Sequence, residues 1–227
     1  MQSEHHTTAA GVRLAYTVHG SPDAPPVVLL HGLGDRGTSW APVHARFAER
    51  FRVITVDLRG HGDSDRPGTY SLQLMCDDVA DLLDHLGSRR VTVIGHSMGG
   101  MVAYLLAVRR ADQIDRLVVE DAPPPYPRDR PVPERPDEPL DFDWAVVPAI
   151  VGQVNAGDPL AWAQLARITA PTLLVGGGAA SHVPQDTLTD VAARIPCCTV
   201  LTIDAGHEVH TARPTEFADA VLDWLGT

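Results

Sequence analysis

Short apolar runs alternate with longer amphipathic stretches along most of this chain. Five of the runs, rich in Val, Ile and Leu, lie at 27–30, 53–56, 91–94, 117–119 and 171–176. Continuous apolar runs of this length are typical of strands that are buried on both faces of a parallel sheet. Two further strands are predicted at 12–20, where apolar and polar residues alternate, and at 199–203.

The segments between these runs have helical spacing. Apolar residues recur at three- and four-residue steps between Leu72 and Leu86, which predicts a helix with one apolar face. Ser71 is a suitable N-cap for this helix, and Gly87 is a suitable terminator. Other helices are predicted at 40–50, 101–108, 144–165, 185–195 and 214–225. Strands that alternate with helices predict a mostly parallel sheet with helices on both faces.

Prolines interrupt this pattern between residues 122 and 148. Their density excludes a regular helix or a central strand. We expect 122–164 to form a short proline-rich cap within a single domain that spans 1–227. Its large apolar residues either line a substrate pocket or, as we favour for most of them, anchor the cap to the core. They are Tyr126, Phe142, Trp144, Val146, Val147, Ile150 and Trp162.

Composition narrows the class of protein. An apolar content of 44% and a charged content of 21% are ordinary for a globular domain. The net charge of −11 argues against nucleic acid and anionic membranes as partners. No stretch approaches the roughly 20 apolar residues of a membrane span, and the N-terminal stretch 1–6 has no signal-peptide pattern. The cysteines fit neither a disulfide framework nor a zinc site. We therefore expect a cytoplasmic protein.

The apolar run 91–94 leads directly into Gly95-His96-Ser97-Met98-Gly99, and a helical segment follows. Strand, G-x-S-x-G turn and helix together form the context of a nucleophile elbow. Such a turn holds the serine in a strained backbone conformation with its hydroxyl exposed, and glycines leave room where side chains would clash. The ordinary alternative is a strand–helix turn that is rich in small residues.

Four segments resemble those of the α/β-hydrolase family and follow the family's order. They are His31-Gly32-Leu33-Gly34, Asp57-Leu58-Arg59-Gly60-His61-Gly62-Asp63-Ser64, Gly95-His96-Ser97-Met98-Gly99-Gly100 and Ala205-Gly206-His207. The resemblance covers nearly the whole chain. It implies an α/β-hydrolase fold with an eight-stranded, mostly parallel sheet, and a triad in the order serine, acid, histidine. It also implies that the charged residues of the second segment fix their own loop.

The resemblance assigns chemical roles to single residues. Ser97 is the expected nucleophile, and His207 is the base that takes its proton during attack. His210, on the same loop, is the alternative base. The backbone N–H groups of Leu33 and Met98 are expected to form the oxyanion hole. This chemistry needs no cofactor and no metal.

The acid departs from the family's common pattern, because Ala180 occupies the position where the acid usually stands. Some family members take the acid instead from the end of the strand that follows the elbow helix, here Glu120-Asp121. A buried glutamate is costly unless it is paired, and a hydrogen bond to His207 would pair it. We therefore favour Glu120 over Asp121, and both over Asp186, which has the position of a helix-start residue.

A serine at the elbow excludes the aspartate-nucleophile chemistry by which some family members cleave epoxides or carbon–halogen bonds. It predicts a carboxylesterase-like serine hydrolase that forms an acyl-enzyme on Ser97. The expected substrate is a small or apolar, uncharged carboxylic ester, thioester or lactone. Two alternatives stay open. One is a non-hydrolytic or carbon–carbon-bond enzyme that uses Ser97 and His207 as an acid–base pair, and the other is a ligand-binding protein without turnover.

Overall fold

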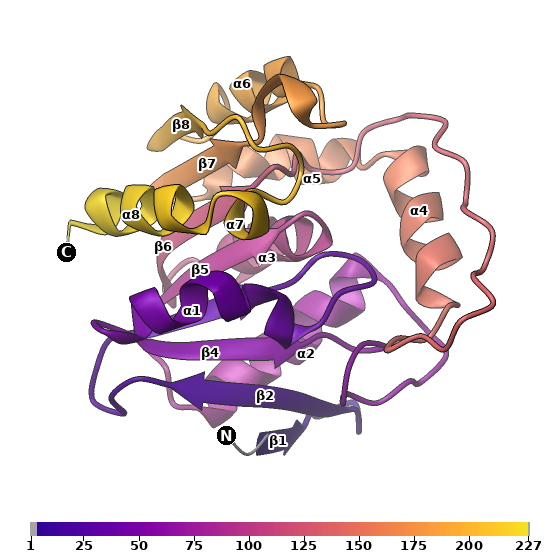
Figure 1. Cartoon of the computed structure of the whole chain (residues 1–227), viewed down its shortest axis with the longest axis horizontal. Coiled ribbons are helices and arrows are strands. Elements are labelled where there is room, and N and C mark those ends of the chain that lie inside the picture. The colour runs from indigo at the N-terminus through magenta and orange to yellow at the C-terminus, as the bar shows by residue number, and fades with distance from the viewer. Residues whose placement is uncertain (1–3, 227) are drawn as a thin grey trace.

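A twisted eight-stranded sheet forms the centre of the protein, with the strand order β1-β2-β4-β3-β5-β6-β7-β8 (Figure 1). The computed structural model describes residues 4–226, so Met1 to Ser3 of the N-terminal stretch lie outside the described residues. The strands are β1 (Glu4–Thr7), β2 (Arg13–His19), β3 (Pro26–Leu30), β4 (Arg52–Asp57), β5 (Val91–His96), β6 (Ile114–Glu120), β7 (Thr172–Gly176) and β8 (Cys198–Thr202). The β1–β2 and β2–β4 pairs are antiparallel and the other five pairs are parallel, which confirms the expected mostly parallel sheet.

Helices cover both faces of this sheet (Figure 1). The α-helices are α1 (Ala41–Ala48), α2 (Leu72–His85), α3 (Met98–Arg109), α4 (Val146–Ala156), α5 (Pro159–Gln164), α6 (Gln185–Ala192), α7 (Val209–Ala212) and α8 (Pro214–Leu225). The short 3-10 turns are η1 (Gly37–Trp40), η2 (Leu165–Arg167) and η3 (Gly178–Ala180). None of the helices within residues 4–226 is both long and apolar enough to cross a membrane.

The two helical layers explain why the central strands are apolar throughout. Val28 and Leu30 of β3 pack into the core that α2 and α3 complete. Val27 and Leu29, which alternate with them, pack into the core that α1 and α8 complete. Successive side chains of a strand point to opposite faces, so a strand between two helical layers needs apolar residues at every position.

Two segments differ from the sequence prediction. No strand was expected at β1, because its Glu-His-His-Thr sequence is polar, but it pairs with β2 at the edge of the sheet. One helix was expected at 144–165, but Gly157 ends α4 with a φ of 73°, and Asp158 caps α5 by accepting a hydrogen bond from Ala161 N. By contrast, α2 begins after Ser71, whose side chain accepts from Leu74 N as expected.

The segment 122–164 runs as an extended loop and then as α4 and α5 between β6 and β7 (Figure 1). Most of its large apolar residues anchor it: Val146, Val147 and Ile150 belong to the buried core on the side of α2 and α3, and Phe142, Trp144 and Trp162 pack against that core. Among the candidates for a substrate pocket, Ile150 lines the cavity described below. The anchoring role that we favoured for most of these side chains therefore fits their positions.

Candidate active site

The turn between β5 and α3 has the strained geometry that the G-x-S-x-G pattern predicts. Ser97 has a φ of 51° and a ψ of −115°, a region that non-glycine residues seldom adopt. A Cβ atom on Gly95 would lie 2.4 Å from the carbonyl oxygen of Gly99, and one on Gly99 would lie 2.3 Å from that of Leu30. Only glycine fits at these two positions, so the close packing of α3 on β3 and β5 holds Ser97 in its strained conformation.

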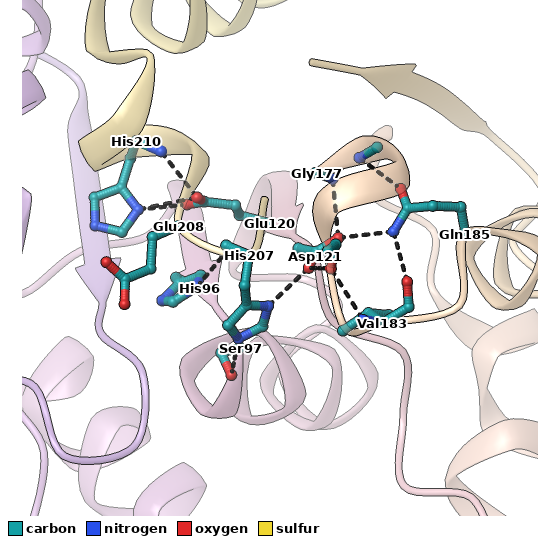
Figure 2. Close-up of polar contacts among 12 residues, drawn as sticks. His96, Ser97, Glu120, Asp121, Gly177, Val183, Gln185, His207, Glu208 and His210 are labelled. Atoms are coloured by element: carbon teal, nitrogen blue, oxygen red, sulfur yellow. Dashed lines mark hydrogen bonds and ion pairs between the residues drawn. The ribbon is translucent and has the colours of Figure 1, made fainter. Parts of the chain in front are cut away.

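Three polar side chains from separate loops meet at this turn (Figure 2). Nε2 of His207 lies 2.9 Å from Oγ of Ser97, and Nδ1 of His207 lies 2.7 Å from Oδ2 of Asp121. His207 stands on the loop between β8 and α7, and its side chain is 21% exposed, whereas the Asp121 side chain is fully buried. The arrangement brings Ser97 and His207 together as expected, with Asp121 as the third member.

The expectation that Glu120 pairs with His207 is wrong. The Glu120 carboxylate instead accepts from the backbone N–H of His210 at 2.9 Å and contacts Nδ1 of His210 at 2.8 Å. Glu120 shares its side of β6 with Val118, which faces the core beneath α1 and α8, and His210 packs on that side against Trp40. The buried glutamate does have a histidine partner, as its burial requires, but the partner is His210.

Asp121 leaves the strand with a φ of 48° and turns toward the loop after β7. There its carboxylate accepts from Gly177 N at 2.9 Å and Gln185 Nε2 at 3.1 Å, and from the Ser181 hydroxyl. Burial raises the pKa of this carboxyl, but the hydrogen bonds from His207, Ser181, Gly177 and Gln185 outweigh burial and lower the pKa overall. Asp121 therefore stays ionised beside His207.

No sequence pattern directly predicted that the loop after β7 supports the acid. It is the loop in which the family's common acid would stand, and it supplies hydrogen-bond donors to an acid on the neighbouring strand instead. Asp186, the remaining candidate acid, lies in the first turn of α6.

A second buried pair holds the histidine loop from the other side (Figure 2). The bonds from His210 to Glu120 fix the start of α7, three residues after His207. His96 Nε2 contacts the carbonyl oxygen of His207 at 3.0 Å. Burial is the main cause that lowers the pKa of His96 to about 4, so this side chain is neutral and can donate Nε2–H to that carbonyl.

The loops after β3 and β4 brace each other near the site. His31 Nε2 accepts from Leu58 N at 3.0 Å, and His61 Nε2 accepts from Gly34 N at 3.2 Å. Asp57 accepts from Gly37 N at 2.6 Å, and Arg59 makes a buried two-point ion pair with Asp78. These contacts fit the loop-fixing role that the family resemblance implies for the charged segment at 57–64.

A cavity opens beside Ser97 and His207, and its empty space, including the mouth, is about 490 Å³. Leu33 and Met98, the two expected sources of oxyanion donors, line it. One wall is apolar and comes from α3 and α4, and another carries charged and polar groups from the segment after β6 and the loop after β7. The lining residues are Leu33, Ser97, Met98, Met101, Asp121, Ala122, Pro123, Arg128, Arg130, Ile150, Val151, Val154, His182, Val183 and His207.

This geometry fits nucleophilic chemistry at a serine. With Nδ1–H donated to Asp121, Nε2 of a neutral His207 faces the Ser97 hydroxyl as a proton acceptor. Within residues 4–226, no cluster of three or more His, Cys, Asp or Glu side chains has an arrangement that would hold a metal ion.

Comparisons with known proteins agree with the fold. The family described as the alpha/beta hydrolase fold matches residues 25–148. An uncharacterized protein of Mycobacterium tuberculosis is 44% identical over 116 residues, which are 51% of this chain and 33% of that protein. A soluble epoxide hydrolase of a Corynebacterium is 41% identical over 123 residues, which are 54% of this chain and 42% of that enzyme. The chain thus matches less than half the length of these relatives.

The similarity to solved structures extends over the whole chain. A hydrolase from Pseudomonas aeruginosa superposes with a TM-score of 0.86 at 26% identity, covering 100% of this chain and 99% of that one. Residues beyond 148, which include His207 and the loop after β7, therefore have counterparts in the same architecture.

Proposed function

Because this chain belongs to the alpha/beta hydrolase fold family, we propose that it is a serine hydrolase that cleaves a carboxylic ester, thioester or lactone. One observation carries the proposal. The Ser97 hydroxyl lies 2.9 Å from a histidine nitrogen whose ring is oriented by a buried carboxylate 2.7 Å away. Such an arrangement activates a serine, which is otherwise a weak nucleophile.

In the proposed reaction, Ser97 Oγ attacks the acyl carbon while His207 Nε2 takes the hydroxyl proton. The carbonyl oxygen becomes an oxyanion, which the backbone N–H groups of Leu33 and Met98 stabilise. His207 then gives its proton to the leaving group, and an acyl-enzyme remains on Ser97. A water molecule, deprotonated by His207, attacks this ester and releases the acid. Asp121 orients His207 throughout and stabilises its protonated form.

The identity of the nucleophile favours acyl transfer over the epoxide chemistry named for the Corynebacterium relative. In the family resemblance, epoxide cleavage belongs to members with an aspartate at the elbow, whereas this chain has Ser97. A serine hydroxyl forms an acyl-enzyme readily, and His207 is placed to serve both the attack and the hydrolysis step.

Labelling with a small fluorophosphonate, followed by intact mass and peptide mapping, tests the proposal. We expect one adduct on Ser97, none in Ser97→Ala, and much slower labelling in His207→Ala. Ser71→Ala is the matched control, because this serine caps α2 and should not affect labelling.

A burst of product from p-nitrophenyl acetate should accompany the labelling, with a stoichiometry near that of the enzyme. An adduct without a burst or turnover would favour the alternative in which Ser97 and His207 act as an acid–base pair. No adduct on the folded protein would refute the activated serine and favour a binding protein.

A further inference from the structure

The cavity beside Ser97 has two guanidinium groups in its wall. Arg128 and Arg130 both line it, and both come from the segment that leads from β6 to α4. The only other formally charged side chain in the lining is Asp121, whose carboxylate is already bonded to four partners. The wall near the triad therefore has an excess of positive charge.

Neither guanidinium forms an ion pair with a carboxylate of residues 4–226, although the chain has 29 acidic residues against 18 basic ones. The side chain of Arg128 touches the Tyr126 hydroxyl at 3.4 Å and stacks over the Tyr126 ring. Its Nε atom is buried without a hydrogen-bond partner. A buried N–H of a cation without an acceptor is costly, which suggests that an acceptor arrives with the substrate.

The backbone around the two arginines is held in place. Arg128 N donates to the carbonyl oxygen of Asn155 at 3.2 Å, and Arg130 N donates to Asn155 Oδ1 at 3.1 Å. The Asn155 amide donates in return to the carbonyl oxygen of Arg130 at 2.7 Å. Asn155 belongs to the last turn of α4, so this helix fixes the backbone of both arginines beside the cavity.

The arginines share the cavity with His182, which neighbours the catalytic histidine. The His182 ring, which lines the same cavity, is 4.1 Å from the His207 ring, centroid to centroid. Burial, His207 and the positive charges of Arg130 and Arg128 together lower the pKa of His182. The same cavity is lined by Ile150, Val151 and Val154 of α4, whose apolar side chains suit a short hydrocarbon chain.

We propose that Arg128 and Arg130 form a carboxylate-binding site, so that the preferred substrate is an ester, thioester or lactone that carries a carboxylate beyond a short apolar spacer. The inference rests on the proposed function for the reaction at Ser97. The proposed substrate is anionic, in place of the uncharged substrate that we expected from the sequence. Guanidinium groups bind carboxylates through charge-assisted, often two-point hydrogen bonds, and they retain their charge at any working pH. They also offset the repulsion that a protein with a net charge of −11 exerts on an anion.

Matched pairs of esters test this site. Mono-p-nitrophenyl glutarate differs from p-nitrophenyl pentanoate only in a terminal carboxylate in place of a methyl group. A second pair, 4-carboxyphenyl acetate and 4-carbamoylphenyl acetate, places the charge on the leaving group. We expect kcat/KM of the wild-type protein to favour the anionic member of at least one pair about 10-fold to 100-fold, as for charged hydrogen bonds of this kind.

Variants assign the preference to the two arginines. Arg128→Gln and Arg130→Gln should lower kcat/KM for the anionic ester much more than for the neutral ester, so that most of the preference is lost. Arg135→Gln is the matched control, since Arg135 is exposed on the same segment and does not line the cavity. Equal use of both members of both pairs, or equal losses on anionic and neutral esters, would overturn the proposal.

A binding measurement separates this inference from the proposed function. Ser97→Ala should bind mono-p-nitrophenyl glutarate more tightly than the pentanoate in calorimetry, and Arg128→Gln in that background should abolish the difference. If the wild-type protein hydrolysed no ester and formed no Ser97 adduct, the proposed function would fail. The two affinities would still show whether the cavity binds a carboxylate. Equal affinities would refute the carboxylate site itself.

Discussion

Asp121→Asn should remove nearly all hydrolytic activity and leave the fold intact. The Asp121 carboxylate lies 2.7 Å from Nδ1 of His207, which keeps the Nδ1–H tautomer and leaves Nε2 as the acceptor for the Ser97 proton. Asparagine has nearly the same size, but its amide can present an N–H to Nδ1. That contact favours the tautomer with the proton on Nε2, which cannot act as the base.

The expected loss can be set from this geometry. An amide at the acid position of a serine–histidine pair lowers kcat by about 10⁴-fold, which corresponds to about 5 kcal/mol of transition-state stabilisation. The cost in the free energy of unfolding should be smaller, about 1–3 kcal/mol. The amide oxygen still accepts from part of the set of donors around it, namely Gly177, Ser181 and Gln185.

Glu120→Gln is the matched comparison, because it makes the same chemical change one residue earlier in the chain. Glu120 binds His210 and contributes to the elbow through its backbone carbonyl, which accepts from Ser97 N at 3.1 Å. The variant should lose about 1–3 kcal/mol of stability as its bonds to His210 weaken. Its kcat should fall by less than about 10-fold, because the His207 tautomer is unchanged.

Steady-state kcat for p-nitrophenyl acetate, measured beside urea unfolding of the same preparations, distinguishes the two variants. Imidazole ¹⁵N shifts of His207 would report the tautomer directly. If folded Glu120→Gln lost as much activity as Asp121→Asn, or if Asp121→Asn kept the wild-type tautomer and rate, the assignment of Asp121 would be refuted.

Two further predictions concern stability. Gly99→Ala should lower the free energy of unfolding by about 1–3 kcal/mol, as overpacking does, because the added Cβ would lie 2.3 Å from a backbone oxygen. Gly152→Ala in α4 has open space and should be neutral or slightly stabilising. Equal unfolding midpoints for the two variants would contradict this prediction. Acidification from pH 6.5 to 4 should lower stability, because burial lowers the pKa of His61 and of His96 to about 4 in the folded state, while the unfolded chain takes up protons near 6.5. Each histidine accounts for a loss of up to about 3 kcal/mol in the free energy of unfolding, and a thermal midpoint that stays constant over that range would disprove the prediction.

The sequence alone determined the layered fold and the elbow. Apolar runs such as 91–94 specify strands buried on both faces, and the spacing between Leu72 and Leu86 specifies a one-sided helix. Both signals are local, because each depends on which residues follow one another at a fixed period. The role of the glycines around Ser97 is also predictable from the sequence, since only glycine fits where the backbone of α3 approaches two strands.

Local signals were weaker where the cause lies elsewhere in the fold. The polar strand β1 has no apolar pattern of its own and is held by the edge of β2. The arginines at 128 and 130 stand in a proline-rich segment without periodicity. They line the cavity because Asn155, at the end of a helix formed later in the chain, fixes their backbone.

Only the tertiary structure decided between the two adjacent carboxylates at the end of β6. Both faces of the central sheet are covered with apolar helices, so the sequence around Glu120 and Asp121 does not reveal which face each side chain meets. The register of β6 turns Glu120 toward His210 beneath α1 and α8, while the positive φ of Asp121 directs its carboxylate to His207. Neighbours in the sequence thus point to different histidines, because Glu120 still follows the register of β6 whereas Asp121, one residue past the strand, has left the extended conformation.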